Sequence, residues 1–97
     1  MYYDVFGSIN EMLSAPQKID LREMDKLAKG LDERNIPYIR RTCFDGEQIV
    51  CDSWDAICHR GSYGHEKGLL EIMGSIVQND DDDVEGYLSA EDILLRL

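Results

Sequence analysis

The segment YIRRTCF at residues 38–44, followed by DG at 45–46 and EQIVC at 47–51, decides the fold. Polar and apolar residues alternate in both runs, and a turn signal between two such runs is typical of a β-hairpin. A two-residue Asp45-Gly46 loop is one connection. A three-residue loop over 44–46 instead pairs Cys43 with Glu47 and Ile39 with Cys51. We predict the longer loop, because it places the apolar side chains of both strands on one face, namely Ile39, Cys43, Ile49 and Cys51.

A third strand follows the hairpin. After a tight turn at residues 52–53, the run WDAICH at 54–59 is again rich in strand-forming residues, and Trp54 is expected in the core. The predicted sheet is therefore a three-stranded antiparallel meander.

Helical periodicity lies on both sides of this sheet. Residues 2–13 carry apolar side chains spaced by three and four, and the pattern ends before Pro16. A second helix is predicted to begin at Asp20 as N-cap, with Glu23 completing a capping box, and to end near Asn35.

Two more helices are expected after the sheet. One begins near His65 and buries an apolar stripe, Leu69, Ile72, Met73, Ile76 and Val77. The other is short and is capped by Ser89 with Asp92. The predicted architecture is α+β, in the order α-α-β-β-β-α-α, with about four helices packed mainly on one face of the sheet. All 97 residues form one domain: a helical part (1–37), a β-meander (38–60) and a helical acidic part (61–97).

Composition excludes several classes of protein. The 20 acidic and 10 basic residues give a formal charge of −10, which argues against binding nucleic acid directly through a broad basic surface. No apolar run approaches the ~18 residues that span a bilayer, and the first residues lack the pattern of a secretion signal. The 3 cysteines are odd in number and fit no common zinc spacing, so we expect free thiols in a reducing compartment, with no metal and no cofactor.

Most of the negative charge lies in the last third of the chain. Two interpretations of this tract stay open: a solvating loop that keeps a small protein soluble, or an acidic face that imitates a phosphate backbone and binds a basic groove. The candidate partner-binding residues are Asp80, Asp81, Asp82, Asp83, Glu85, Glu91 and Asp92. Glu66 and Glu71 are expected to be solvated.

The turn around residues 60–68 is a second candidate site. Its glycines, Gly61, Gly64 and Gly68, precede a predicted helix and are compatible with backbone amides that bind an anion. A plain strand-to-helix turn that needs positive φ at glycine explains them as well, and it is the favoured interpretation because it is several times commoner. The residues to inspect for a small ligand are Arg60, Ser62, Tyr63 and His65. No sequence motif indicates a catalytic residue.

Three motifs of the second half carry a resemblance: WDAICHxGSYG from residue 54, GLLEIMG from 68 and GYLSAED from 86. Over about residues 38–97 the chain resembles a family of small uncharacterised acidic proteins from phages and mobile elements of gut Firmicutes. The resemblance implies a protein made in a bacterial cytoplasm, and small acidic inhibitors of CRISPR nucleases are one known type of such accessory protein.

These observations favour a non-enzymatic binding protein that acts on a basic, nucleic-acid-binding host protein, as an anti-CRISPR-like inhibitor and DNA mimic would. Two alternatives remain: a small-ligand or accessory enzyme domain that uses the turn from Arg60 to His65, and a homo-oligomer, such as a homodimer, that packs through the terminal helix, Ile93 to Leu97.

Overall fold

A computed structural model describes residues 18–97 of the chain. Five strands form one antiparallel sheet in the sequential order β1-β2-β3-β4-β5, and two α-helices flank them in the chain. The elements are α1 (Arg22–Glu33), β1 (Ile39–Cys43), β2 (Gly46–Val50), β3 (Trp54–Cys58), β4 (Leu70–Gly74), β5 (Val84–Leu88) and α2 (Ala90–Leu94). The helix predicted over residues 2–13 lies outside the described residues.

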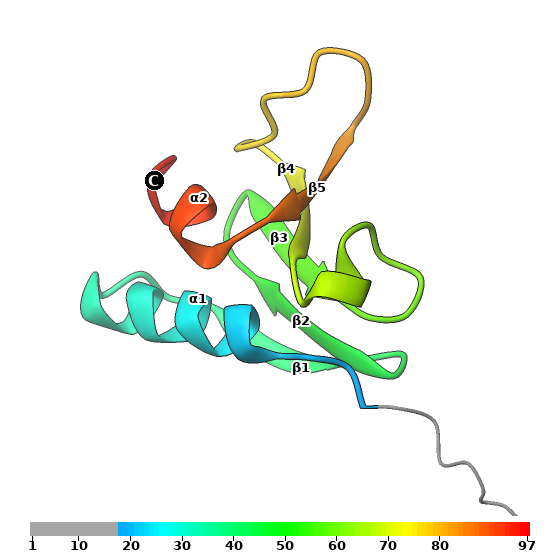
Figure 1. Ribbon diagram of the computed structural model, residues 1–97. Helices are drawn as coiled ribbons and strands as arrows, with labels where there is room; N and C mark the ends of the chain where they lie inside the picture. Colours follow the sequence, from blue (N-terminus) through cyan, green and yellow to red (C-terminus); the bar gives the residue numbers. More distant parts are fainter. Residues whose placement is uncertain (1–17) are drawn as a thin grey trace, which may run out of the picture.

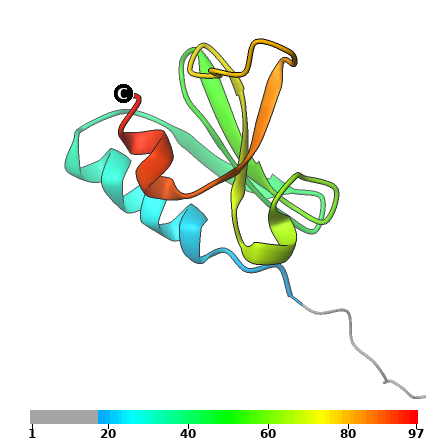
Figure 2. The same ribbon diagram turned by 45° about the horizontal axis from the view of Figure 1, so that its top comes forward.

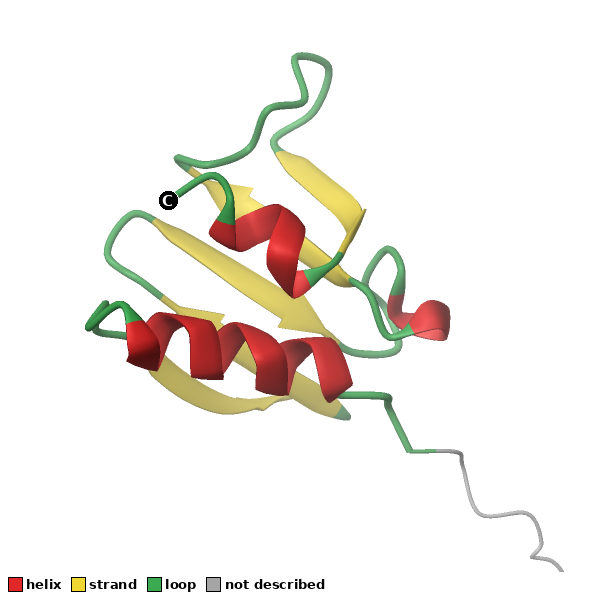
Figure 3. Cartoon of the chain, turned by 60° about the vertical axis from the view of Figure 1, so that its left-hand side comes forward, coloured by secondary structure: helices red, strands yellow, loops and turns green. Residues whose placement is uncertain are grey.

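Both helices lie against the same side of the strongly twisted sheet (Figures 1 and 3). The apolar face of α1 supplies Met24, Leu27 and Leu31 to the core, and α2 adds Ile93. The strands contribute alternate residues to the same core, Ile49, Trp54, Ala56, Cys58, Leu70, Ile72 and Leu88. Trp54, at 8% exposure, is a core residue as predicted. The opposite face of the sheet carries no helix within residues 18–97, as the turned view in Figure 2 also shows.

The class prediction of α+β is correct, but the predicted architecture of three strands and about four helices is wrong. The segment predicted as a helix from His65 contains only a 3-10 turn at His65–Lys67, followed by strand β4. Gly64 and Gly68 bracket the 3-10 turn with φ of 99° and 71°, and this left-handed backbone stops a helix from continuing. In LEIMG (70–74), every second side chain, Leu70 and Ile72, points into the core. This spacing of two is that of a β-strand and not of a helix.

The fifth strand is an element that the sequence analysis missed. β5 pairs with β4 through Leu70–Leu88 and Met73–Val84, with an irregularity between these pairs. Its sequence, VEGYL, holds Gly86 and Glu85, which are uncommon in strands, and it is so short that its pairing partner decides its conformation.

The predicted hairpin register is also wrong. Cys43 pairs with Gly46 across a two-residue turn of Phe44 and Asp45, so neither the predicted three-residue loop nor an Asp45-Gly46 loop forms. Gly46 is the first residue of β2, and only glycine fits there because a methyl group would overlap the carbonyl oxygen of Cys58. The shift sets Arg40 opposite Ile49 and leaves Ile39 64% exposed.

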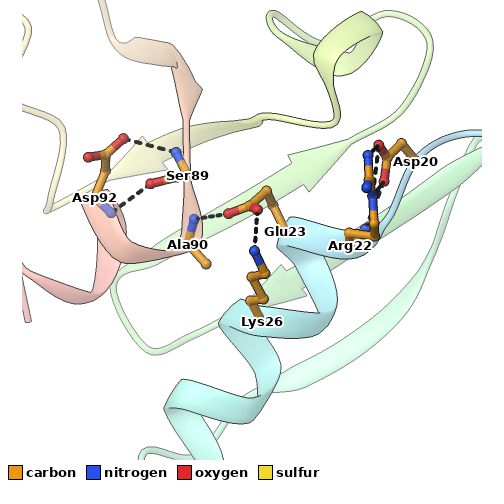
Figure 4. A network of polar contacts seen from close by, with 7 residues as sticks. All are labelled: Asp20, Arg22, Glu23, Lys26, Ser89, Ala90 and Asp92. Carbon is orange, nitrogen blue, oxygen red and sulfur yellow. Dashed lines mark hydrogen bonds and ion pairs between the residues drawn. The ribbon is translucent and has the colours of Figure 1, made fainter.

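The ends of the two helices differ in how well they were predicted. At α2 the capping box is confirmed: Ser89 Oγ accepts the Asp92 amide at 3.1 Å, and Asp92 Oδ2 accepts the Ser89 amide at 3.0 Å. At α1 the predicted capping box is wrong, because the N-cap is Leu21. Glu23 instead accepts the amide of Ala90 at 2.8 Å, which joins the starts of the two helices (Figure 4). A contact between helices outcompetes the local cap.

Candidate partner-binding surface

The four consecutive aspartates lie in the loop that joins β4 to β5, which projects beyond the sheet at the top of Figure 1. All four are exposed, as predicted for this tract. Asn79 shapes the loop: its Oδ1 accepts the Asp81 amide at 3.1 Å, and its Nδ2 donates to the Val84 carbonyl at 3.4 Å. No basic side chain within residues 18–97 forms an ion pair with Asp80, Asp81, Asp82 or Asp83. The loop therefore presents four uncompensated carboxylates to solvent.

Glu85 lies next to this loop but has an internal partner. Arg96 donates to both of its carboxylate oxygens, at 2.9 and 2.7 Å, and also to the Ile76 carbonyl at 3.0 Å. The Gln78 amide adds a third hydrogen bond to Glu85 at 2.9 Å. Hydrogen bonding to Arg96, reinforced by the Gln78 amide, lowers the pKa of Glu85 to about 2. Glu85 thus holds the base of the acidic loop to the chain beyond α2.

Glu91 and Asp92 belong to a different part of the surface. Both lie in the first turn of α2, where Asp92 is used by the capping box (Figure 4). Glu91 lines a groove between the two helices together with Lys26 and Arg34. The seven predicted carboxylates therefore do not share one environment: Asp80 to Asp83 are uncompensated, Glu85 and Asp92 have structural partners, and Glu91 shares its groove with two cations.

The turn of residues 60–64 is closed by its own hydrogen bonds. The Arg60 amide donates to Asp45 Oδ1 at 2.9 Å, and its guanidinium lies 3.5 Å from Asp45 Oδ2. Ser62 is buried; its hydroxyl donates to the His59 carbonyl at 2.8 Å and accepts the His59 amide at 3.0 Å. These hydrogen bonds give the turn a structural role, which is to connect β3 to the segment before β4.

The two remaining turn residues point to separate partners. His65 Nδ1 lies 2.7 Å from the Ser62 carbonyl oxygen, and the Tyr63 amide donates to Glu71 Oε1 at 2.8 Å. Arg60 and His65 therefore hold different groups and do not converge on a common point. Glu71, expected to be solvated, is only 8% exposed and anchors this turn to β4. No local pattern around Glu71 predicted this role, because its hydrogen-bond partner, the Tyr63 amide, lies eight residues away in the turn.

A hollow beside the acidic loop was not predicted from the sequence. It has a volume of about 510 Å³ and is lined by Met73, Gly74, Val77, Asn79, Asp82 and Asp83. Met73 was assigned to the buried stripe of a helix, whereas it is 49% exposed on the uncovered face of the sheet. Reading residues 70–74 as an alternating strand would have placed Met73 on the side opposite Leu70 and Ile72.

The cysteines are free, as expected. Cys58 is buried, and burial, with smaller contributions from Asp20 and Asp45, raises its thiol pKa to about 11. Burial also raises the pKa of the Cys51 thiol. Because the thiolate is the nucleophile and the metal ligand, both groups are held in their unreactive form at neutral pH. Within residues 18–97, no three His, Cys, Asp or Glu side chains are grouped so as to hold a metal ion.

No protein-family model, curated protein or solved structure matches this chain. In the described part of the chain, no helix has the length and hydrophobicity needed to cross a lipid bilayer.

Proposed function

We propose that the protein is a non-enzymatic binding protein whose acidic loop, Asp80 to Asp83, engages a basic surface of another protein. The observation that carries this proposal is the absence of any ion-pair partner, within residues 18–97, for four adjacent exposed carboxylates. Asp25 and Glu47 are both paired with Arg40, whereas other single carboxylates, such as Glu33 and Asp52, also lack a cationic partner within residues 18–97. What distinguishes the loop is that its four unpaired carboxylates are consecutive. A partner supplies the missing cations.

The partner class is a nucleic-acid-binding host protein. A duplex presents roughly one negative charge per 1.7 Å of its axis, and four consecutive aspartates offer a comparable local density to a groove built for phosphates. The resemblance of residues 38–97 to small proteins of phages and mobile elements supports the same class, because such proteins include inhibitors of host defence enzymes.

The test compares the wild-type protein with a variant in which Asp80, Asp81, Asp82 and Asp83 are all replaced by Asn. Affinity purification from a bacterial host lysate is followed by titration of the recovered partner with each protein at several salt concentrations. The wild type should bind with an affinity that falls steeply as salt rises, and duplex DNA should compete with it. The matched control replaces four exposed carboxylates outside the loop, Asp32, Glu33, Asp52 and Glu91, by their amides, so that both variants lose the same charge. Equal binding by wild type and the fourfold variant would refute the proposal.

A further inference from the structure

The hollow beside the acidic loop is lined by both apolar and acidic side chains. Its apolar lining is Met73, which is 49% exposed, and Val77, which is half-buried. Asp82 and Asp83 also line it, and neither has an ion-pair partner within residues 18–97. Asn79, a further lining residue, donates a hydrogen bond to the Val84 carbonyl at 3.4 Å and so joins the two ends of the acidic loop.

This combination matches one kind of side chain. Arginine and lysine have long apolar stems that pack on hydrophobic surface while the cationic head reaches out to a polar partner. A stem lying on Met73 would bring its cation to the carboxylates of Asp82 and Asp83. An apolar ligand would leave those charges uncompensated, and a bare cation would leave Met73 exposed, so charge complementarity and the apolar lining together select a long cationic side chain.

The hollow also continues across the uncovered face of the sheet. A second, smaller hollow of about 300 Å³ shares Met73 and Gly74 with the first and extends past Val50 and Asp55 to Arg41. Arg41 donates to Gln48 Oε1 at 2.8 Å, and its charge limits the basic part of a bound segment to the end near Asp82 and Asp83. Asp55 accepts a hydrogen bond from Gln48 at 2.6 Å, so its carboxylate is oriented on this face. The two hollows together offer room for an extended segment that crosses β4 and β3 next to Met73.

We propose that this hollow binds an arginine or lysine side chain of an extended basic segment of the partner, with its stem on Met73 and Val77 and its cation at Asp82 and Asp83. The inference rests on the proposed function and adds to it the residue type that is recognised and an apolar contribution to binding. A partner bound by charge alone would make no use of the hollow.

The first experiment is a titration of the full chain, labelled with ¹³C at the methionine methyl groups, with a tri-arginine peptide capped at both ends. Met24 is fully buried in the core and serves as the internal reference, whereas the Met73 methyl lies in the hollow. The Met73 signal, identified by its loss in Met73→Ser, should shift on addition of peptide while the Met24 signal stays in place. A peptide of three 2,4-diaminobutyric acid residues, compared at pH 6.5 where its amines are protonated, has the same formal charge on shorter stems and should bind about tenfold more weakly.

The second experiment measures tri-arginine binding to Met73→Ser and Asp82→Asn, each checked for an unchanged fold by circular dichroism. Both variants should weaken binding, by about five- to tenfold for the loss of the Met73 contact. If Met73→Ser binds as the wild type does and the two peptides bind equally, the inference is wrong although the proposed function stands. A shift of the Met73 signal with protein concentration alone, with a dimer detected by light scattering, would also overturn it, because a second copy would then cover the hollow. The inference would also be wrong if the Met73 signal did not shift at millimolar concentrations of the tri-arginine peptide.

Discussion

The ion pair between Glu85 and Arg96 is predicted to hold the acidic loop to the end of the chain, and its removal should lower the free energy of unfolding by a measurable amount. The perturbation is Glu85→Gln, which removes the charge and keeps the shape. The side chains of Arg96 and Glu85 are 14% and 22% exposed, and the guanidinium binds both carboxylate oxygens. A change in the pKa of Glu85 from 4.5 to about 2 sets an upper bound of roughly 3.5 kcal/mol, at about 1.4 kcal/mol per pH unit. Because the pair lies at the surface and is screened by solvent, we expect about 1–2 kcal/mol.

The dependence on pH gives this prediction a definite sign. The pKa of Glu85 is lower in the folded protein than in the unfolded chain, so the pair contributes fully above pH 4.5 and its contribution disappears as the pH falls toward 2. Asp20, whose pKa is lowered to about 2 by hydrogen bonds from Arg22, changes stability in the same direction. The difference between wild type and Glu85→Gln at each pH cancels that background and isolates Glu85.

The assay is urea unfolding, followed by the fluorescence of Trp54, at pH 7 and at several values down to pH 2.5. The variant should be less stable than the wild type by about 1–2 kcal/mol at pH 7, and the difference should shrink to roughly half near pH 3. Glu91→Gln is the control, with an expected change below about 0.5 kcal/mol at every pH. A difference between wild type and Glu85→Gln that is absent at pH 7, or constant over the whole range, would refute the reasoning.

Three further substitutions test the fold in the same unfolding assay. Gly46→Ala should destabilise the protein by about 2–3 kcal/mol, since its methyl group meets the Cys58 carbonyl; a neutral result would mean that the hairpin register is different. Ser89→Ala removes the N-cap of α2 and should lower stability by about 1 kcal/mol, whereas retention of full stability would show that the cap contributes nothing. Phe44→Asn should raise stability by about 0.5–1 kcal/mol, because Phe44 is 84% exposed with φ of 54°; a loss of stability would show that its contact with His59 outweighs the strain.

Local patterns predicted several elements well. The capping box of Ser89 and Asp92 identified α2, and the apolar spacing of Met24, Leu27 and Leu31 identified α1, because each signal lies within a few residues of the helix that it forms. The exposure of the four aspartates also follows from a local signal, because consecutive like charges repel one another and favour solvent.

The errors have a common cause in contacts between residues far apart in the chain. The apolar residues from Leu69 to Val77 fit a helical stripe and a strand almost equally well, and pairing with β3 decided for the strand. The register of the hairpin depends on Gly46 meeting Cys58, and the role of Glu23 depends on Ala90. No window of local sequence contains both members of these pairs.

The candidate surface divides in the same way. The amino-acid sequence alone determined the excess of negative charge near its end and the exposure of Asp80 to Asp83, since both follow from composition and repulsion. Only the tertiary structure decided which carboxylates are compensated and that Met73 lies beside Asp82 and Asp83, because the partners that neutralise or flank a charge are chosen by packing between separate elements.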